Sequence, residues 1–159
     1  MRSEKSTMTA YVEQILLSEY NRYFRLAMSF VHNEADAADI VQSGAYKAIR
    51  GSRALRKQEH AGTWIYRIML NEIFRFHKPG HFVTLDEIPE TGYEDRYENF
   101  DLKKALDSLP AKEKAVVELR YFEDLKLEEI AEILQENVST VKSRLYRSMK
   151  KLRVELEEA

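Results

Sequence analysis

The chain of 159 residues contains no cysteine, and it has little glycine or proline. Without cysteine there can be no disulfide framework, no cysteine-ligated metal site and no cysteine nucleophile, which is consistent with a reducing compartment. Five glycines and three prolines leave few points at which a helix must end. We therefore expect long helices and an all-α fold.

Long apolar runs are missing as well. No stretch reaches the roughly 18 apolar residues that a membrane span needs, and the first ten residues lack the apolar core of a signal peptide. A third of all residues are charged. These features predict a cytoplasmic protein with no membrane span.

Charge is unevenly distributed, although the formal net charge is only −2. Residues 81–100 carry six acidic side chains against one basic one, and they include Pro89 and Gly92. We interpret them as an acidic linker between a domain at 1–80 and another at 101–159. Between Ser139 and Arg153 there are six basic side chains and no acid. That stripe is consistent with a polyanion partner or with an ordinary solvated helix face.

The N-terminal domain shows apolar residues at three- and four-residue spacings. This pattern predicts helices at about 9–31, 34–50 and 61–77. Asn33 is suited to cap the second helix, and Pro79 with Gly80 ends the third. The third helix is apolar on more than one side, so we expect it to meet two neighbours, or one neighbour and a ligand.

The C-terminal domain is predicted to contain helices at about 102–109, 110–122 and 127–134, and a last helix that begins near Val138. Residues 135–137 form a three-residue turn, and Asn137 is suited to cap the last helix. This arrangement predicts a helix-turn-helix whose second helix can enter a major groove. An ordinary helical hairpin with a solvated basic face is the alternative.

The angular positions of the residues around the axis of the last helix predict which side chains point outward. An apolar stripe runs through Val138, Val141, Leu145 and Met149. Opposite that stripe we expect Thr140, Ser143, Arg144, Arg147 and Lys151. Lys142 is placed near the edge of the core, which makes it a weaker candidate for a base contact.

Four segments of the sequence resemble one known family. LEEIAEILQENVSTVKSRLYRSMKKL resembles the C-terminal promoter-reading domain of sigma factors, and ALDSLPAKEKAVVELRYFEDLKLEEIA resembles the segment before it. NEADAADIVQ resembles the helix that binds core polymerase, and TWIYRIMLNEIFRFHK the helix that melts and reads the downstream promoter element. In this order the segments resemble a bacterial sigma factor of the extracytoplasmic-function (ECF) type within the sigma-70 family.

The resemblance implies a division of labour among the residues. The residues implied at the minus-thirty-five element are Ser139, Thr140, Lys142, Ser143, Arg144, Arg147 and Lys151. Those implied at the minus-ten element are Trp64, Arg67, Asn71, Arg75 and Lys78, with a packed-core role as the alternative for Trp64. Those implied against the clamp helices of core polymerase are Asp36, Asp39, Ile40 and Gln42, where Ile40 could also belong to the internal core.

The same resemblance implies the partners. They are core RNA polymerase, through its clamp helices and flap, promoter DNA and an anti-sigma factor, and the protein would join the nucleoid as part of the holoenzyme. The acidic linker would be threaded towards the RNA exit path, or would serve as a solvated tether.

The chain departs from the family pattern at two places. Ser43 and Gly44 stand where an acidic residue usually follows the Val-Gln pair, and Gln135 occupies a turn position often held by glycine. A residue other than glycine in a left-handed turn costs about 1 kcal/mol, so we expect a variant turn geometry before the last helix.

Other classes of protein are less well supported. His60, His77 and His81 do not form a set of metal ligands, and there is no glycine-rich phosphate loop or nucleophile elbow. We therefore expect no enzyme activity, no cofactor, no metal and no small-molecule substrate. The main rivals are a conventional regulator with a sensing or dimerising N-terminal domain, and a sigma-like decoy that binds proteins but not DNA.

Overall fold

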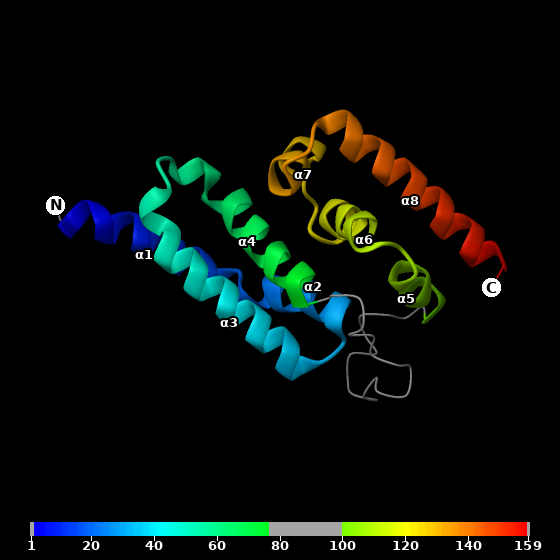
Figure 1. Cartoon of the computed structure of the whole chain (residues 1–159), viewed down its shortest axis with the longest axis horizontal. Coiled ribbons are helices and arrows are strands. Elements are labelled where there is room, and N and C mark those ends of the chain that lie inside the picture. The colour runs from blue at the N-terminus through cyan, green and yellow to red at the C-terminus, as the bar shows by residue number, and fades with distance from the viewer. Residues whose placement is uncertain (1, 77–99, 159) are drawn as a thin grey trace. The chain divides into compact units, whose positions relative to one another are not determined.

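The computed structural model describes residues 2–76 and 100–158, and every regular element in these ranges is a helix. The chain divides into two compact units, Met1–Ile88 and Pro89–Ala159 (Figure 1). No helix within the described ranges combines the length and apolar character needed to cross a membrane. The predicted acidic linker lies almost entirely outside the described residues. The all-α prediction is confirmed.

Within residues 2–76, the first unit has four helices and two short 3-10 turns. The helices are α1 (Arg2–Ser18), α2 (Tyr20–Val31), α3 (Glu34–Gly51) and α4 (Ala61–Phe76). The 3-10 turns, Ser52–Ala54 and Gln58–His60, lie between α3 and α4. Helix α4 packs against both α2 and α3, which confirms that it meets two neighbours (Figure 1).

The single helix predicted at 9–31 is wrong, because α1 ends at Ser18 and α2 begins at Tyr20. Glu19 has φ −107° and ψ 11°, and its carbonyl accepts from the backbone amides of Arg22 and Tyr23. No glycine or proline marks this break. The buried residues before it, such as Leu16, and after it, such as Tyr23, keep the spacing of one helix, so periodicity could not reveal the interruption.

The core of the first unit is closely packed between α3 and α4. A Cβ built on Gly44 of α3 would lie 2.5 Å from Sδ of Met69 on α4, so any side chain at this position would require the buried Met69 side chain to move. Aromatic edge-to-face pairs join α2 to α4 on the other side, with centroids 5.3 Å apart for Tyr23 and Tyr66. The absence of a side chain at Gly44 thus lets the two helices approach.

The second unit contains α5 (Phe100–Asp107), α6 (Ala111–Val117), a π-helical turn (Glu118–Phe122), α7 (Leu127–Leu134) and α8 (Val138–Glu158). The predicted helix at 110–122 is therefore α-helical only in its first part, and Pro110 directly precedes it. The core of the second unit includes a cluster of side chains from α5, the α5–α6 connection, α6 and α8: Ala105, Leu106, Leu109, Val117 and Leu152.

The turn between α7 and α8 corrects another expectation. Gln135 takes the left-handed conformation, with φ 55° and ψ 45°, so the turn keeps the geometry that glycine usually provides. The amide of Gln135 donates to the carbonyl of Glu132 (3.3 Å), and that of Glu136 to Ala131 (3.0 Å). This pair of bonds is a Schellman motif, which satisfies the last carbonyls of α7. The predicted variant geometry is wrong.

Candidate nucleic-acid interface

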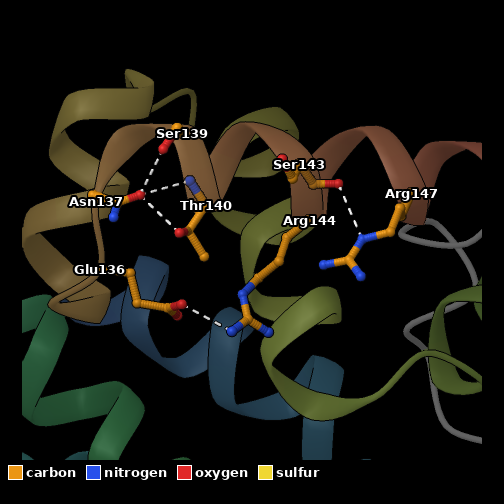
Figure 2. Close-up of polar contacts among 7 residues, drawn as sticks. All are labelled: Glu136, Asn137, Ser139, Thr140, Ser143, Arg144 and Arg147. Atoms are coloured by element: carbon orange, nitrogen blue, oxygen red, sulfur yellow. Dashed lines mark hydrogen bonds and ion pairs between the residues drawn. The ribbon is translucent and has the colours of Figure 1, made fainter.

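Helix α8 begins with a side-chain cap that confirms the prediction for Asn137. Its Oδ1 accepts hydrogen bonds from the backbone amide of Thr140 (2.8 Å), from Oγ1 of Thr140 (2.7 Å) and from Oγ of Ser139 (2.8 Å) (Figure 2). The cap satisfies a free amide at the start of the helix. Both hydroxyls keep lone pairs, so they can still accept hydrogen bonds.

The buried face of α8 is rotated from the predicted one. Val141, Ser148 and Leu152 are buried, whereas Val138 and Met149 lie at the exposed edge. At 3.6 residues per turn this shift corresponds to roughly 45°. Ser148 can lie on the buried face because its hydroxyl donates to the carbonyl of Arg144 (2.7 Å).

The rotation changes two of the predicted orientations. Arg144 was expected to point away from the core, but it is half-buried and its Nη2 lies 2.8 Å from Oε2 of Glu136 (Figure 2). Lys142 was expected near the core edge, but it is exposed. The prediction of an outward Arg144 is therefore wrong, and so is the edge position of Lys142.

The remaining predicted residues of α8 are accessible. Ser143 and Arg147 are exposed, and Nε of Arg147 lies 3.4 Å from the Ser143 carbonyl. Nζ of Lys151 lies 3.0 Å from Oε2 of Glu113, but its side chain is still half exposed. Lys150, which the sequence did not single out, is exposed on the same side as Ser143. Lys150 could have been found from the sequence only if Ser148 had been placed on the buried face, because Lys150 then lies on the outward side of the helix.

The predicted minus-ten residues of α4 share one face of an unbroken helix, except Lys78, which lies outside the described residues. Asn71 and Arg75 are exposed, and Trp64 and Arg67 are half-buried. The indole of Trp64 packs against α3, since a Cβ on Gly51 would lie 3.2 Å from it. Trp64 thus has a packing role and also an accessible surface.

A buried carboxylate on α4 was missed in the sequence. Glu72 accepts a hydrogen bond from Oγ of Ser43 (3.1 Å) and pairs with Nζ of Lys47, both on α3. Burial raises the pKa of Glu72, but the hydrogen bonds from Lys47 and Ser43 and the charges of Lys47 and Arg75 outweigh it and hold the pKa below its ordinary value. The opposite charges of Lys47 and Glu72, on two predicted helices, were the signal in the sequence from which this contact could have been predicted.

The start of α3 carries the residues predicted to bind core polymerase. Asn33 caps the helix, with Oδ1 3.0 Å from the backbone amide of Asp36. Asp39 and Gln42 are exposed, Asp36 is half-buried and Ile40 lies in the core. Of the two roles predicted for Ile40, membership of the core is therefore the one confirmed.

The exposed side of α3 continues beyond Gln42. Tyr46 and Ile49 are exposed, and at the helical spacing they follow Asp39 and Gln42 along one face. Among the described residues, no group of three or more His, Asp or Glu side chains could hold a metal ion.

Comparison with known protein families supports both halves of the chain. Residues 16–78 match the family model described as Sigma-70 region 2, and residues 99–152 match that described as Sigma-70, region 4. RNA polymerase sigma factor SigV of Bacillus subtilis (strain 168) is 40% identical over 158 residues, which cover 96% of this chain and 95% of that protein.

Two solved structures have a similar fold. One is CnrH in complex with the cytosolic domain of CnrY, with a TM-score of 0.74 and 20% identity over 97% of this chain and 95% of that one. The other is the sigma factor RpoE in complex with the anti-sigma factor NepR from Bartonella quintana, with a TM-score of 0.69 and 22% identity over 91% and 96%. From the family matches and the SigV relationship it follows that the chain belongs to the sigma-70 family of RNA polymerase sigma factors, as a member of the ECF type.

Proposed function

We propose that this sigma factor reads the upstream, minus-thirty-five promoter element with the outward face of α8. The observation that carries this proposal is that Lys142, Arg147 and Lys150 are exposed on α8 and have no acidic partner among the described residues. Such cations can grip guanine edges or phosphate oxygens. Ser139, Thr140 and Ser143 add hydroxyls at the same end of the helix.

The polar face of α4 is proposed to hold the minus-ten element. Capture of single-stranded bases needs aromatic and cationic surface, and this face offers Trp64, Arg67, Asn71 and Arg75. Lys78 follows in the sequence and belongs to the same proposal. The contacts of Glu72 with Lys47 and Ser43 join α4 to α3, and they thereby help to position the polar face of α4.

Helix α3 is proposed to bind the clamp helices of core polymerase, and the flap is proposed as a second contact elsewhere on the chain. Asp36, Asp39 and Gln42 supply polar contacts, and the exposed Tyr46 and Ile49 extend the surface with apolar area. Large apolar side chains gathered on one exposed face mark protein contacts. The capped start of α3 holds this surface rigid.

The remaining parts of the proposal concern partners, location and chemistry. An anti-sigma factor is proposed as a regulator, by analogy with the RpoE complex with NepR. A cytoplasmic location, with nucleoid association in the holoenzyme, is proposed as well. Sigma factors are non-catalytic initiation factors, and we propose that this chain has no enzymatic activity of its own.

Run-off transcription with purified core polymerase tests the proposal as a whole. The chain should direct initiation from a promoter obtained by in vitro selection with the holoenzyme, and core polymerase alone should not. A chain that binds core polymerase but never initiates would be a decoy, and this result would refute the proposal.

The α3 surface has its own test. Asp39→Lys should weaken binding to core polymerase about tenfold, because it reverses the charge of an exposed side chain on the proposed contact. The matched control is Glu13→Lys, which reverses an exposed acid on α1. Equal affinities of the two variants, both with normal helicity by circular dichroism, would exclude this face as the interface.

A further inference from the structure

We infer that Glu136 is a positioning residue that holds Arg144 away from DNA and thereby limits binding to DNA of arbitrary sequence. This inference rests on the proposed role of α8 at the upstream element. It assigns a function to an acid in the turn and removes Arg144 from the set of DNA-reading side chains.

The backbone of Glu136 is fixed by the turn itself. Its amide donates to the carbonyl of Ala131 (3.0 Å), directly after the left-handed Gln135. From this position the side chain reaches along α8, and Oε2 accepts from Nη2 of Arg144 at 2.8 Å. Figure 2 shows Arg144 turned back toward Glu136 in the turn, whereas Arg147 folds back along α8 to the carbonyl of Ser143.

The pair is largely enclosed. The side chains of Arg144 and Glu136 are 23% and 16% exposed. Nε of Arg144 and Oε1 of Glu136 are buried without a hydrogen-bond partner among the described residues. The guanidinium is therefore held at one edge by a single charged hydrogen bond. Without Glu136 it would be left as an enclosed cation with no counter-charge.

The other cations of α8 differ from Arg144. Lys142, Arg147, Lys150 and Arg153 are exposed and have no acidic partner among the described residues. Lys151 pairs with Glu113 but remains 53% exposed, so it can leave its partner at little cost. Arg144 is the α8 cation in the described range that is both enclosed and neutralised.

Neutralising this arginine has a consequence for specificity. Each phosphate that a cation contacts adds about 0.9 to the steepness of the fall in log affinity with log salt concentration, regardless of the base sequence. Because Glu136 already neutralises Arg144, that side chain adds nothing to this non-specific attraction. Loss of the carboxylate charge would leave the guanidinium without a counter-charge, so that it could pair with a DNA phosphate beside α8.

The experiment measures holoenzyme binding to a selected promoter and to the same promoter with a scrambled upstream element, at several salt concentrations. Glu136→Gln should steepen the salt dependence by about one ion. It should also raise affinity for the scrambled element by roughly five- to tenfold at 0.1 M salt, and so reduce the preference for the selected one. The matched control Glu128→Gln removes an exposed acid of α7 that does not contact Arg144, and it should leave the slope unchanged.

Two further variants separate release of Arg144 from damage to the turn. Arg144→Met keeps the apolar stem and removes the charge, and its salt dependence should equal that of the wild type. The double variant Glu136→Gln with Arg144→Met should also return the slope to the wild-type value, since no arginine is left to release.

Three results would overturn the inference. An unchanged slope in Glu136→Gln would show that Arg144 stays in place without its partner. A slope shallower by one ion in Arg144→Met would show that Arg144 already contacts phosphate in the wild type. A wild-type holoenzyme without any preference for the selected upstream element would refute the proposed function of α8 and this inference together.

Discussion

Two pairs of helices carry the proposed binding faces, and they are held together in different ways. Helices α3 and α4 meet through contacts between residues far apart in the sequence, such as Gly44 with Met69 and Lys47 with Glu72. The turn between α7 and α8 is held to α8 by contacts at short sequence separation, such as the Asn137 cap, three residues from Thr140, and the pair of Glu136 with Arg144, eight residues apart. We therefore expect changes between α3 and α4 to affect mainly stability, and changes near the turn to affect mainly DNA reading.

The close approach of α3 and α4 should give the largest loss of stability. Gly44→Ala places a methyl group 2.5 Å from Sδ of the buried Met69, which must move. We expect an overpacking cost of about 1–3 kcal/mol in the free energy of unfolding, of which the higher helix propensity of alanine offsets about 1 kcal/mol. Gly62→Ala is the matched control, because its Cβ would meet nothing within 4 Å, and it should be neutral or stabilising. Urea denaturation measures both variants. Equal effects of the two substitutions would show that the contact between Gly44 and Met69 does not limit stability.

The outward face of α8 should show the opposite behaviour. Arg147→Ala should change stability by less than about 0.5 kcal/mol, because the side chain is exposed. If Arg147 grips a base, the selected upstream element should lose about 1–3 kcal/mol of binding and discrimination should flatten at one position. Holoenzyme binding to single-base promoter variants is the measurement. A loss that is uniform over all sequences would instead identify a phosphate contact.

The Glu72 contacts should give a smaller effect that depends on pH. Glu72→Gln should cost about 1–2 kcal/mol at pH 7, less than for a fully buried pair because Lys47 is partly exposed. The folded state lowers the pKa of Glu72, so its contribution is complete above the ordinary value of 4.5 and is lost as the pH falls through the lower folded pKa.

Unfolding curves from pH 7 downward test this dependence. The difference between wild type and Glu72→Gln should stay constant to about pH 5 and shrink below the ordinary carboxyl range. A difference that grows on acidification would mean that burial, and not the contact with Lys47, dominates at Glu72.

The turn before α8 should give the smallest change, and in the stabilising direction. Gln135 has φ 55°, so Gln135→Gly removes the strain of a left-handed side chain and should add about 0.5–1 kcal/mol to the free energy of unfolding. Thermal unfolding of the two proteins measures it. A loss of stability would mean that the glutamine side chain makes a contact worth more than the strain.

The sequence predicted the helices well because their signals are local. The caps at Asn33 and Asn137 follow directly from side-chain chemistry, and both are present. The break at Glu19 and the π-helical turn at Glu118–Phe122 were not predictable, since neither has a glycine or proline and the apolar spacing continues through both. These features depend on tertiary packing, which periodicity does not contain.

The candidate site was predicted less completely than the helices. Residue types identified the cationic helix, but a buried face defined by apolar residues alone placed the outward face of α8 too close to Arg144. A serine whose hydroxyl bonds the preceding turn can be buried, as Ser148 is. The pairing of Glu136 with Arg144 follows from that rotation, so it could not be found from charge alone.

The length of α8 makes it act as a lever. The helix runs without interruption over 21 residues, which is about 30 Å at 1.5 Å per residue. Near its far end Leu152 packs in the cluster with Leu106 and Leu109 of the α5 region. From Leu152 to Ser139 the helix is about 20 Å long, so a rotation of about 5° about that contact would move the proposed promoter-reading end by roughly 1.5–2 Å, enough to break a hydrogen bond to a base. Substitutions at Leu106 or Leu109, which lie away from the reading end, can thus change which promoters are used.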